Sequence, residues 1–198
     1  MANRTQKQIN KENLLNQGVL LLTQQGYHGT GLKEILDAVN IPKGSFYNYF
    51  GSKENFAAEV IQHYINPYIE QLQGHLQAPG IGALVALRRY FNESIQELER
   101  TAFKSGCLLG NLMGELGSSN DVCRMALQET LVRYRDVLAT GVARAQAEGT
   151  VRTDRTATEL ADLLLNAWQG ALLRMKIDKS SLPLRQCCQE LLDGFFKA

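Results

Sequence analysis

The residues of this chain that are best suited to specific chemical contacts gather in one stretch, Leu32–Lys53. The second half of the stretch is rich in amine, hydroxyl and amide groups, carried by Lys43, Ser45, Tyr47, Asn48 and Tyr49. Tyrosine hydroxyls can donate to phosphate oxygens, and Lys53 adds positive charge near the start of a following helix, where the helix dipole also attracts anions. Gly44 lacks a side chain and would let the backbone approach a groove wall closely. These groups could contact the phosphates and a groove of double-stranded DNA. The alternative for Tyr47 and Tyr49 is that they are ordinary half-exposed aromatic residues.

Two short helices must position these groups. The first, predicted over Leu32–Val39, ends at Asn40, a residue that tolerates the left-handed conformation better than most. The second is predicted over Pro42–Tyr49, because proline suits the first turn of a helix. Phe46 and Phe50 are four residues apart and would pack inward together. Helices this short are not stable alone, so they need the support of a larger helical domain.

The segment Pro42–Glu54 resembles the DNA-binding signature of the TetR family of transcriptional regulators, x-K-G-x-F/L-Y-x-H/Y-F-x-x-K-E/D. The resemblance implies a bacterial one-component repressor with a helix-turn-helix. It also implies a set of DNA-binding residues, with Lys53 on phosphate: Thr30, Lys43, Gly44, Ser45, Tyr47, Asn48, Tyr49 and Lys53. The chain departs from the family in having Gly31, after Thr30, where many members have Ser or Thr. It also has Asn40 in place of the usual glycine.

Almost every other segment has apolar residues at spacings of three and four, which is typical of helices. We therefore predict an all-α protein of about nine helices. A three-helix DNA-binding domain would occupy residues 1–52, and a larger effector-binding and dimerisation domain residues 53–198. Gly26 is expected to end the first helix. Pro67 is expected to kink or break the helix that Ser52 caps, because proline removes one backbone hydrogen bond and clashes with the preceding turn.

Composition narrows the function classes. The net charge of the 198-residue chain is only +1, but residues 1–53 carry six Lys and Arg against three Asp and Glu, so the positive surplus lies at the DNA-binding end. No run of 18 apolar residues could span a bilayer, and no apolar stretch follows the N-terminal charges, so we expect a cytoplasmic protein without a membrane partner. The four cysteines lack metal-site spacing, and we expect neither a metal nor a cofactor.

The family resemblance implies a homodimer, because one reading helix spans too little DNA. Two related heads would read a palindromic operator with half-sites about 34 Å apart or a little more. The apolar stripe of the helix after Thr156, together with the last helix, would form the interface through Leu160, Leu164, Ala167, Ala171, Leu191 and Phe195. The alternative is that this stripe belongs to an intramolecular core.

Aromatic and polar residues are mixed along the helices of the larger domain, which suits a pocket for a small effector. The candidates are Tyr64, Tyr90, Phe103, Asn111 and Trp168, and each could instead belong to the core. Cys107 follows Ser105-Gly106 at a predicted helix start beside Lys104, where the helix dipole and the cation favour a thiolate. The stretch SGCLLGNLMGEL resembles the NemR and AcuR branch of the TetR family, some of whose members respond to electrophiles or oxidants. Cys107 is therefore a candidate sensor, with a buried small hydrophobic residue as the alternative.

Two other function classes are open. A cysteine-dependent enzyme would use Cys107 as nucleophile with His63 or His75 as base. A helical adaptor that does not bind DNA would be supported if the surface of Tyr47 and Tyr49 proved to be buried.

Overall fold

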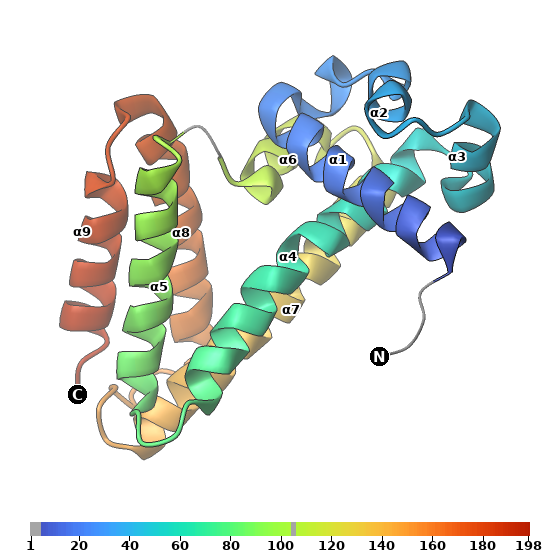
Figure 1. Cartoon of the computed structure of the whole chain (residues 1–198). Helices are drawn as coiled ribbons and strands as arrows, with labels where there is room; N and C mark the ends of the chain where they lie inside the picture. The colour runs from blue at the N-terminus through green and yellow to red at the C-terminus, as the bar shows by residue number, and fades with distance from the viewer. Residues whose placement is uncertain (1–4, 104–105) are drawn as a thin grey trace. The chain divides into compact units, whose positions relative to one another are not determined.

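The computed structural model describes residues 5–103 and 106–198, and these form nine α-helices and one π-helical turn (Figure 1). The helices are α1 (Gln6–Gly29), α2 (Leu32–Val39), α3 (Lys43–Phe50), α4 (Lys53–Gln77), α5 (Ala83–Arg100), α6 (Leu108–Leu116), α7 (Asp121–Ala147), α8 (Ala157–Asp178) and α9 (Leu182–Glu190), and the turn is η1 (Leu191–Phe195). The prediction of an all-α fold with about nine helices is confirmed for the described part of the chain. Within that part, no helix is long and apolar enough to cross a membrane.

The chain divides into two compact units. The first comprises Met1–Asn66 and Leu108–Thr130, and the second comprises Pro67–Cys107 and Leu131–Ala198. Helices α4 and α7 each contribute one end to each unit. A functional boundary after residue 52 stays a prediction.

In the first unit, α1 and α4 approach each other closely at Gly18. A Cβ atom added there would lie 2.6 Å from side-chain atoms of both Phe56 and Val60, so only glycine fits without a shift. Phe56 is completely buried and packs against Phe46 and Phe50, with ring centroids 5.2 and 4.9 Å apart. This aromatic cluster joins α3 to the start of α4.

The long helical segment of α1 stops at Gly26, as expected, and a short second segment follows it. Gly26 adopts φ 75° and ψ 179°, which interrupts the helix, but helical structure resumes and α1 continues to Gly29. The left-handed φ explains why glycine occupies the position. The predicted stop at Gly26 is confirmed, and the short helical segment that follows it to Gly29 was not predicted.

Helix α4 is capped as predicted, since the backbone N–H of Asn55 donates to Ser52 Oγ at 3.1 Å. The helix is not broken at Pro67, which lies inside it. Buried Ile65 and Ile69 flank the proline and hold the helix by packing, which offsets the lost backbone hydrogen bond.

In the second unit, α5, α8 and α9 lie side by side (Figure 1). Phe91 of α5 packs edge-on against Trp168 of α8, with 4.7 Å between ring centroids. The predicted capping box at the start of α8 is present, since Thr156 and Glu159 exchange side-chain and backbone hydrogen bonds. A single isolated antiparallel bridge joins Val151 to Lys197 within the described residues.

Candidate DNA-binding surface

The turn between α2 and α3 has the predicted geometry. Asn40 lies in the left-handed region with φ 58° and ψ 40°, and its backbone N–H bonds to carbonyls at the end of α2. Ile41 is buried at the corner, with 8% of its surface exposed. The buried side chain of Ile41 and the left-handed backbone of Asn40 therefore fix how α3 follows α2.

Helix α3 has one buried face and one exposed face. Phe46 and Phe50 point into the core of the first unit, with ring centroids 5.1 Å apart. The exposed face carries Lys43, Gly44, Tyr47 and Asn48. Tyr47 is 45% exposed. Burial of the Tyr47 and Tyr49 surface would have supported the adaptor alternative, but Tyr47 is exposed and Tyr49 is half-buried.

Lys43 and Gly44 shape the exposed face further. The ammonium of Lys43 lies 5.9 Å from the centre of the Tyr47 ring, within range of a cation–π contact. No atom lies within 4 Å of a Cβ placed on Gly44, so nothing inside this protein requires glycine there. Ser45 and Tyr49 are half-buried at the margin of the same face.

Lys53, predicted to bind phosphate, has an internal role in the structure. Its ammonium donates to the backbone carbonyls of Tyr27 at 2.8 Å and Thr30 at 2.6 Å, and it lies 4.3 Å from the centre of the Tyr27 ring. Burial lowers the pKa of Lys53, and the carboxylates of Glu115 and Glu54 oppose that shift. Two of its three N–H donors are used within the protein, and contact of Lys53 with a phosphate stays a prediction.

Thr30 must be corrected as a DNA contact. Only 1% of its surface is exposed, and its hydroxyl donates to the carbonyl of Gly26 at 2.6 Å. Thr30 therefore stabilises the end of α1 rather than offering its hydroxyl to a phosphate. The neighbouring Gly31 is exposed and contributes no side chain.

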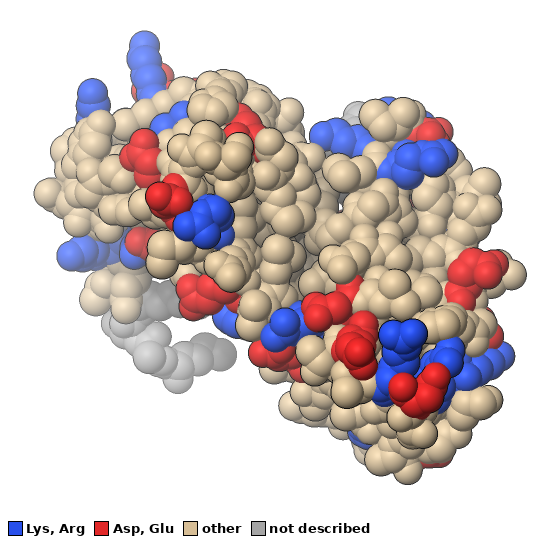
Figure 2. Space-filling view, turned by 180° about the vertical axis from the view of Figure 1, so that it is seen from behind, with Lys and Arg blue, Asp and Glu red and all other residues tan. Residues whose placement is uncertain are grey.

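On the face shown in Figure 2, Lys and Arg alternate with Asp and Glu and form no large patch of one sign. Electrostatic attraction to phosphates does not depend on the DNA sequence. Sequence-specific binding would have to come from the exposed face of α3.

Sequence reasoning missed one feature next to this surface. The carboxylate of Glu115, on α6, accepts hydrogen bonds from the backbone N–H groups of Tyr27 and His28 at 2.8 and 2.6 Å. Asn111, predicted as an effector contact, donates its side-chain amide to the carbonyl of Thr23 at 3.3 Å. Gly26 signalled an interrupted helix, but no local pattern pointed to partners 88 residues away along the chain.

The remaining effector candidates are divided between the two units. Tyr90 and Trp168 are buried in the second unit, and both contact Phe91, with centroid distances of 5.1 and 4.7 Å. The Tyr90 hydroxyl also pairs with that of Tyr134 at 2.8 Å. Two further candidates are half-buried, Tyr64 in the first unit and Phe103 in the second. Their contact with an effector stays a prediction.

Three of the four cysteines are held as neutral thiols. Burial raises the pKa of Cys123 and of Cys187 to about 11, and that of Cys188 to about 12. Cys107 is buried, with 7% of its surface exposed. Its predicted neighbours Lys104 and Ser105 lie outside the described residues, and α6 begins after it, at Leu108.

The predicted interface stripe of α8 is mostly internal. Leu160, Leu164 and Ala171 are 1%, 0% and 8% exposed in the single chain, which supports the intramolecular alternative for these residues. Other apolar side chains of α8 and α9 are exposed: Leu163, Leu173, Ile177 and Leu182. Of the remaining candidates, Ala167 and Leu191 are half-buried, and Phe195 is 41% exposed.

Comparisons with known proteins cover nearly the whole chain. A family model described as "Bacterial regulatory proteins, tetR family" matches residues 14–60, and one described as "Tetracyclin repressor-like, C-terminal domain" matches residues 83–191. The repressor DhaR of Mycobacterium sp. (strain GP1) is 33% identical over 89% of this chain and 87% of its own length. The regulator AcuR of Cereibacter sphaeroides is 34% identical over 87% and 79%. The solved structure of E. coli NemR in reduced form has a TM-score of 0.87 at 26% identity, covering 96% of this chain and 98% of that one.

Proposed function

Since the chain belongs to the TetR family of bacterial regulatory proteins, we propose that it is a sequence-specific transcriptional repressor and that an effector releases it from DNA. Its relatives DhaR and NemR are named transcriptional repressors. The similarity to regulators over most of the chain favours this function over a cysteine-dependent enzyme. His63 and His75 have polar partners, Asn16 and Glu93, at 2.7 and 2.8 Å.

The observation that carries the proposal is the division of α3 into two faces. Phe46 and Phe50 anchor the helix, while Lys43, Tyr47 and Asn48 remain exposed. A recognition helix needs this arrangement, because its backbone must be fixed while its outer side chains reach base edges and phosphates. A basic N-terminal quarter of the chain adds attraction to DNA.

We propose that the protein binds DNA as a homodimer. The two copies would pair through the exposed face of α8 and the adjoining α9. Leu163, Gly170, Leu173 and Ile177 are spaced by three, four or seven residues, which places them on one face of α8. That face is open: Ile177 is 79% exposed, and no atom lies within 4 Å of a Cβ placed on Gly170. A second copy of this chain would cover the stripe in an isologous interface, and its operator would be palindromic.

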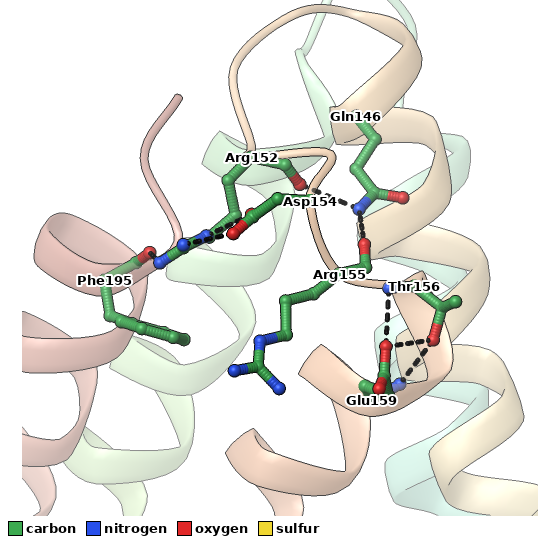
Figure 3. Close-up of polar contacts among 7 residues, drawn as sticks. All are labelled: Gln146, Arg152, Asp154, Arg155, Thr156, Glu159 and Phe195. Atoms are coloured by element: carbon green, nitrogen blue, oxygen red, sulfur yellow. Dashed lines mark hydrogen bonds and ion pairs between the residues drawn. The ribbon is translucent and has the colours of Figure 1, made fainter.

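The loop between α7 and α8 supports a rigid interface (Figure 3). The side chain of Gln146 donates to the backbone carbonyls of Arg152 and Arg155, both at 2.8 Å. Arg152 forms an ion pair with Asp154 at 2.5 Å, and its guanidinium lies 4.4 Å from the centre of the Phe195 ring. These contacts hold the start of α8 beside the C-terminal segment, where part of the interface would lie.

We propose that the effector binds to the domain formed by residues 53–198. Cys107 is the candidate for a group in this domain that reacts with electrophiles. Cys123, Cys187 and Cys188 have raised pKa values, so little of their thiolate is present near neutral pH. One relative, NemR, is described in its solved structure as a reduced form. A cytoplasmic location follows from the proposed role at DNA.

Selection of bound duplexes from a random DNA library tests the proposal. Sequencing of the retained pool should yield an inverted repeat whose half-sites are about one helical turn apart, roughly 34 Å, or a little more. A pool that remains random after several rounds would contradict a sequence-specific repressor. Enrichment of a single half-site would retain DNA recognition and contradict the dimer.

A further inference from the structure

The interruption of α1 at Gly26 leaves backbone groups without their usual helical partners. In a continuous helix the N–H of residue i bonds to the carbonyl of residue i−4. Because Gly26 has φ 75° and ψ 179°, the N–H groups of Tyr27 and His28 cannot reach the preceding turn. The carbonyl of Thr23 loses its regular donor for the same reason. Buried or half-buried backbone groups of this kind need other partners.

Side chains of α6 supply those partners on both sides of the interruption. Glu115 Oε2 accepts from Tyr27 N at 2.8 Å, and Glu115 Oε1 accepts from His28 N at 2.6 Å. Asn111 Nδ2 donates to Thr23 O at 3.3 Å. Asn111 and Glu115 are four residues apart, so they project from the same face of α6. One face of α6 thus replaces the hydrogen bonds that α1 loses.

The interrupted segment leads directly into the helix-turn-helix. The Thr30 hydroxyl bonds to Gly26 O at 2.6 Å, and Lys53 at the start of α4 bonds to the carbonyls of Tyr27 and Thr30. The Tyr27 hydroxyl reaches Glu54 at 3.2 Å. These bonds leave little freedom between the interruption and the first residue of α2. The direction in which α2 and α3 leave α1 therefore depends on how the segment 26–30 is held.

We propose that Asn111 and Glu115 are positioning residues through which α6 holds the interruption of α1 and thereby orients the DNA-reading helix. The proposal rests on the proposed DNA-binding function. Glu115 acts as a two-oxygen acceptor for adjacent N–H groups, a geometry that no neutral side chain reproduces in full.

Two measurements on three variants test this inference. Glu115→Ala removes both acceptors, Glu115→Gln keeps one carbonyl oxygen, and Asn111→Ala removes the donor on the other side. Glu129→Gln is the matched control, because Glu129 is an exposed carboxylate of the same unit that accepts a 3.5 Å hydrogen bond from the side chain of Gln62. Amide hydrogen exchange at Tyr27 and His28 reports the bonds themselves. Affinities for the selected operator and for a scrambled duplex report the orientation of α3.

Glu115→Ala should speed exchange at Tyr27 and His28 and lower operator affinity by about tenfold or more, with little change on scrambled DNA. Glu115→Gln should have an exchange rate and an operator affinity between those of Glu115→Ala and the wild type. If the alanine variant does not fold, Glu115→Gln alone provides the test. Asn111→Ala should lower operator affinity in the same direction, and Glu129→Gln should match the wild type.

Two outcomes overturn the inference. Either exchange at Tyr27 and His28 is unchanged in both Glu115 variants, or it is faster while operator affinity stays at the wild-type value. Failure of the wild type to select any sequence would count against the proposed function and not against the Glu115 bonds. Hydrogen exchange at Tyr27 and His28 tests those bonds without DNA.

Discussion

The rings of Phe46 and Tyr47 lie 5.6 Å apart at 89° to each other, yet Phe46 is completely buried and Tyr47 is 45% exposed. Adjacent residues of a helix point about 100° apart, so this pair marks the edge between the core face and the outer face of α3. Substitutions on the two sides of this edge should have different effects. A change at Phe46 should lower the stability of the fold, and a change at Tyr47 should lower the affinity for DNA.

Replacement of Tyr47 by phenylalanine removes only the hydroxyl. We expect operator binding to weaken by about 1.5 to 3 kcal/mol, the range for a hydrogen bond to a charged group, while the thermal unfolding midpoint stays the same. Fluorescence anisotropy with labelled operator and a melting curve measure the two quantities. Unchanged affinity would remove the Tyr47 hydroxyl from the DNA surface.

Gly44→Ala should separate stability from function. Because a Cβ at this position meets no atom within 4 Å, alanine should raise the free energy of unfolding by about 0.5 to 1 kcal/mol through its better helix propensity. The same methyl group should weaken operator binding if the α3 backbone approaches the groove wall. A variant that is more stable and binds DNA as well as the wild type would show that Gly44 is not needed for close approach.

Lys43 and Lys53 should respond differently to replacement by methionine. Lys43 is exposed, so Lys43→Met should leave stability unchanged and reduce the slope of log affinity against log salt by about one. Lys53 bonds to two carbonyls, so Lys53→Met should lower the free energy of unfolding by roughly 1.5 to 3 kcal/mol. Denaturant titration measures the loss. Full stability of Lys53→Met would contradict the internal role assigned to this ammonium.

Ile177→Arg should prevent dimer formation. The side chain is 79% exposed in the single chain, so the substitution should have little effect on folding and should place a charge in the proposed interface. Sedimentation analysis should show a monomer that has lost high affinity for the full palindrome. Val85→Arg, at a 43% exposed apolar residue of α5, is the control and should remain dimeric. A dimeric Ile177→Arg protein would move the interface elsewhere.

Electrophile labelling tests the proposed thiol sensor. Raised pKa values keep Cys123, Cys187 and Cys188 protonated at pH 7, and their thiolate fraction rises only as the pH approaches about 11 to 12. If Cys107 is the sensor, brief treatment of the native protein at pH 7 should modify Cys107 first, as read by mass spectrometry. The Cys107→Ser protein should stay on its operator in the presence of the electrophile. Earlier labelling of Cys187 or Cys188 would remove Cys107 from this role.

Local chemistry was sufficient to predict several features of the fold. Asn40 ends α2 in the left-handed conformation, Ser52 caps α4, and Thr156 with Glu159 opens α8. Each depends on residues within four positions of one another, so the sequence alone contains the whole interaction. The two-faced character of α3 follows equally from the spacing of its phenylalanines.

Interactions between distant segments were not predictable in the same way. The bonds of Glu115 to the end of α1 join residues 87 and 88 positions apart, and Lys53 meets Tyr27 and Thr30 only once α1 and α4 are packed. Helix α8 shows a different limit. It has leucines at both Leu163 and Leu164, on the open and the buried side, so apolar spacing could not tell the core face from an interface.

The central claim is that the outer face of α3 reads a specific DNA sequence, and a competition titration tests it most directly. The wild-type protein is titrated with the selected operator and with a scrambled duplex of equal length, at salt concentrations from about 50 to 200 mM. Affinity for both duplexes should fall as salt rises, while the operator remains favoured by at least about a thousandfold. Equal affinity for the two duplexes at every salt concentration would contradict the claim.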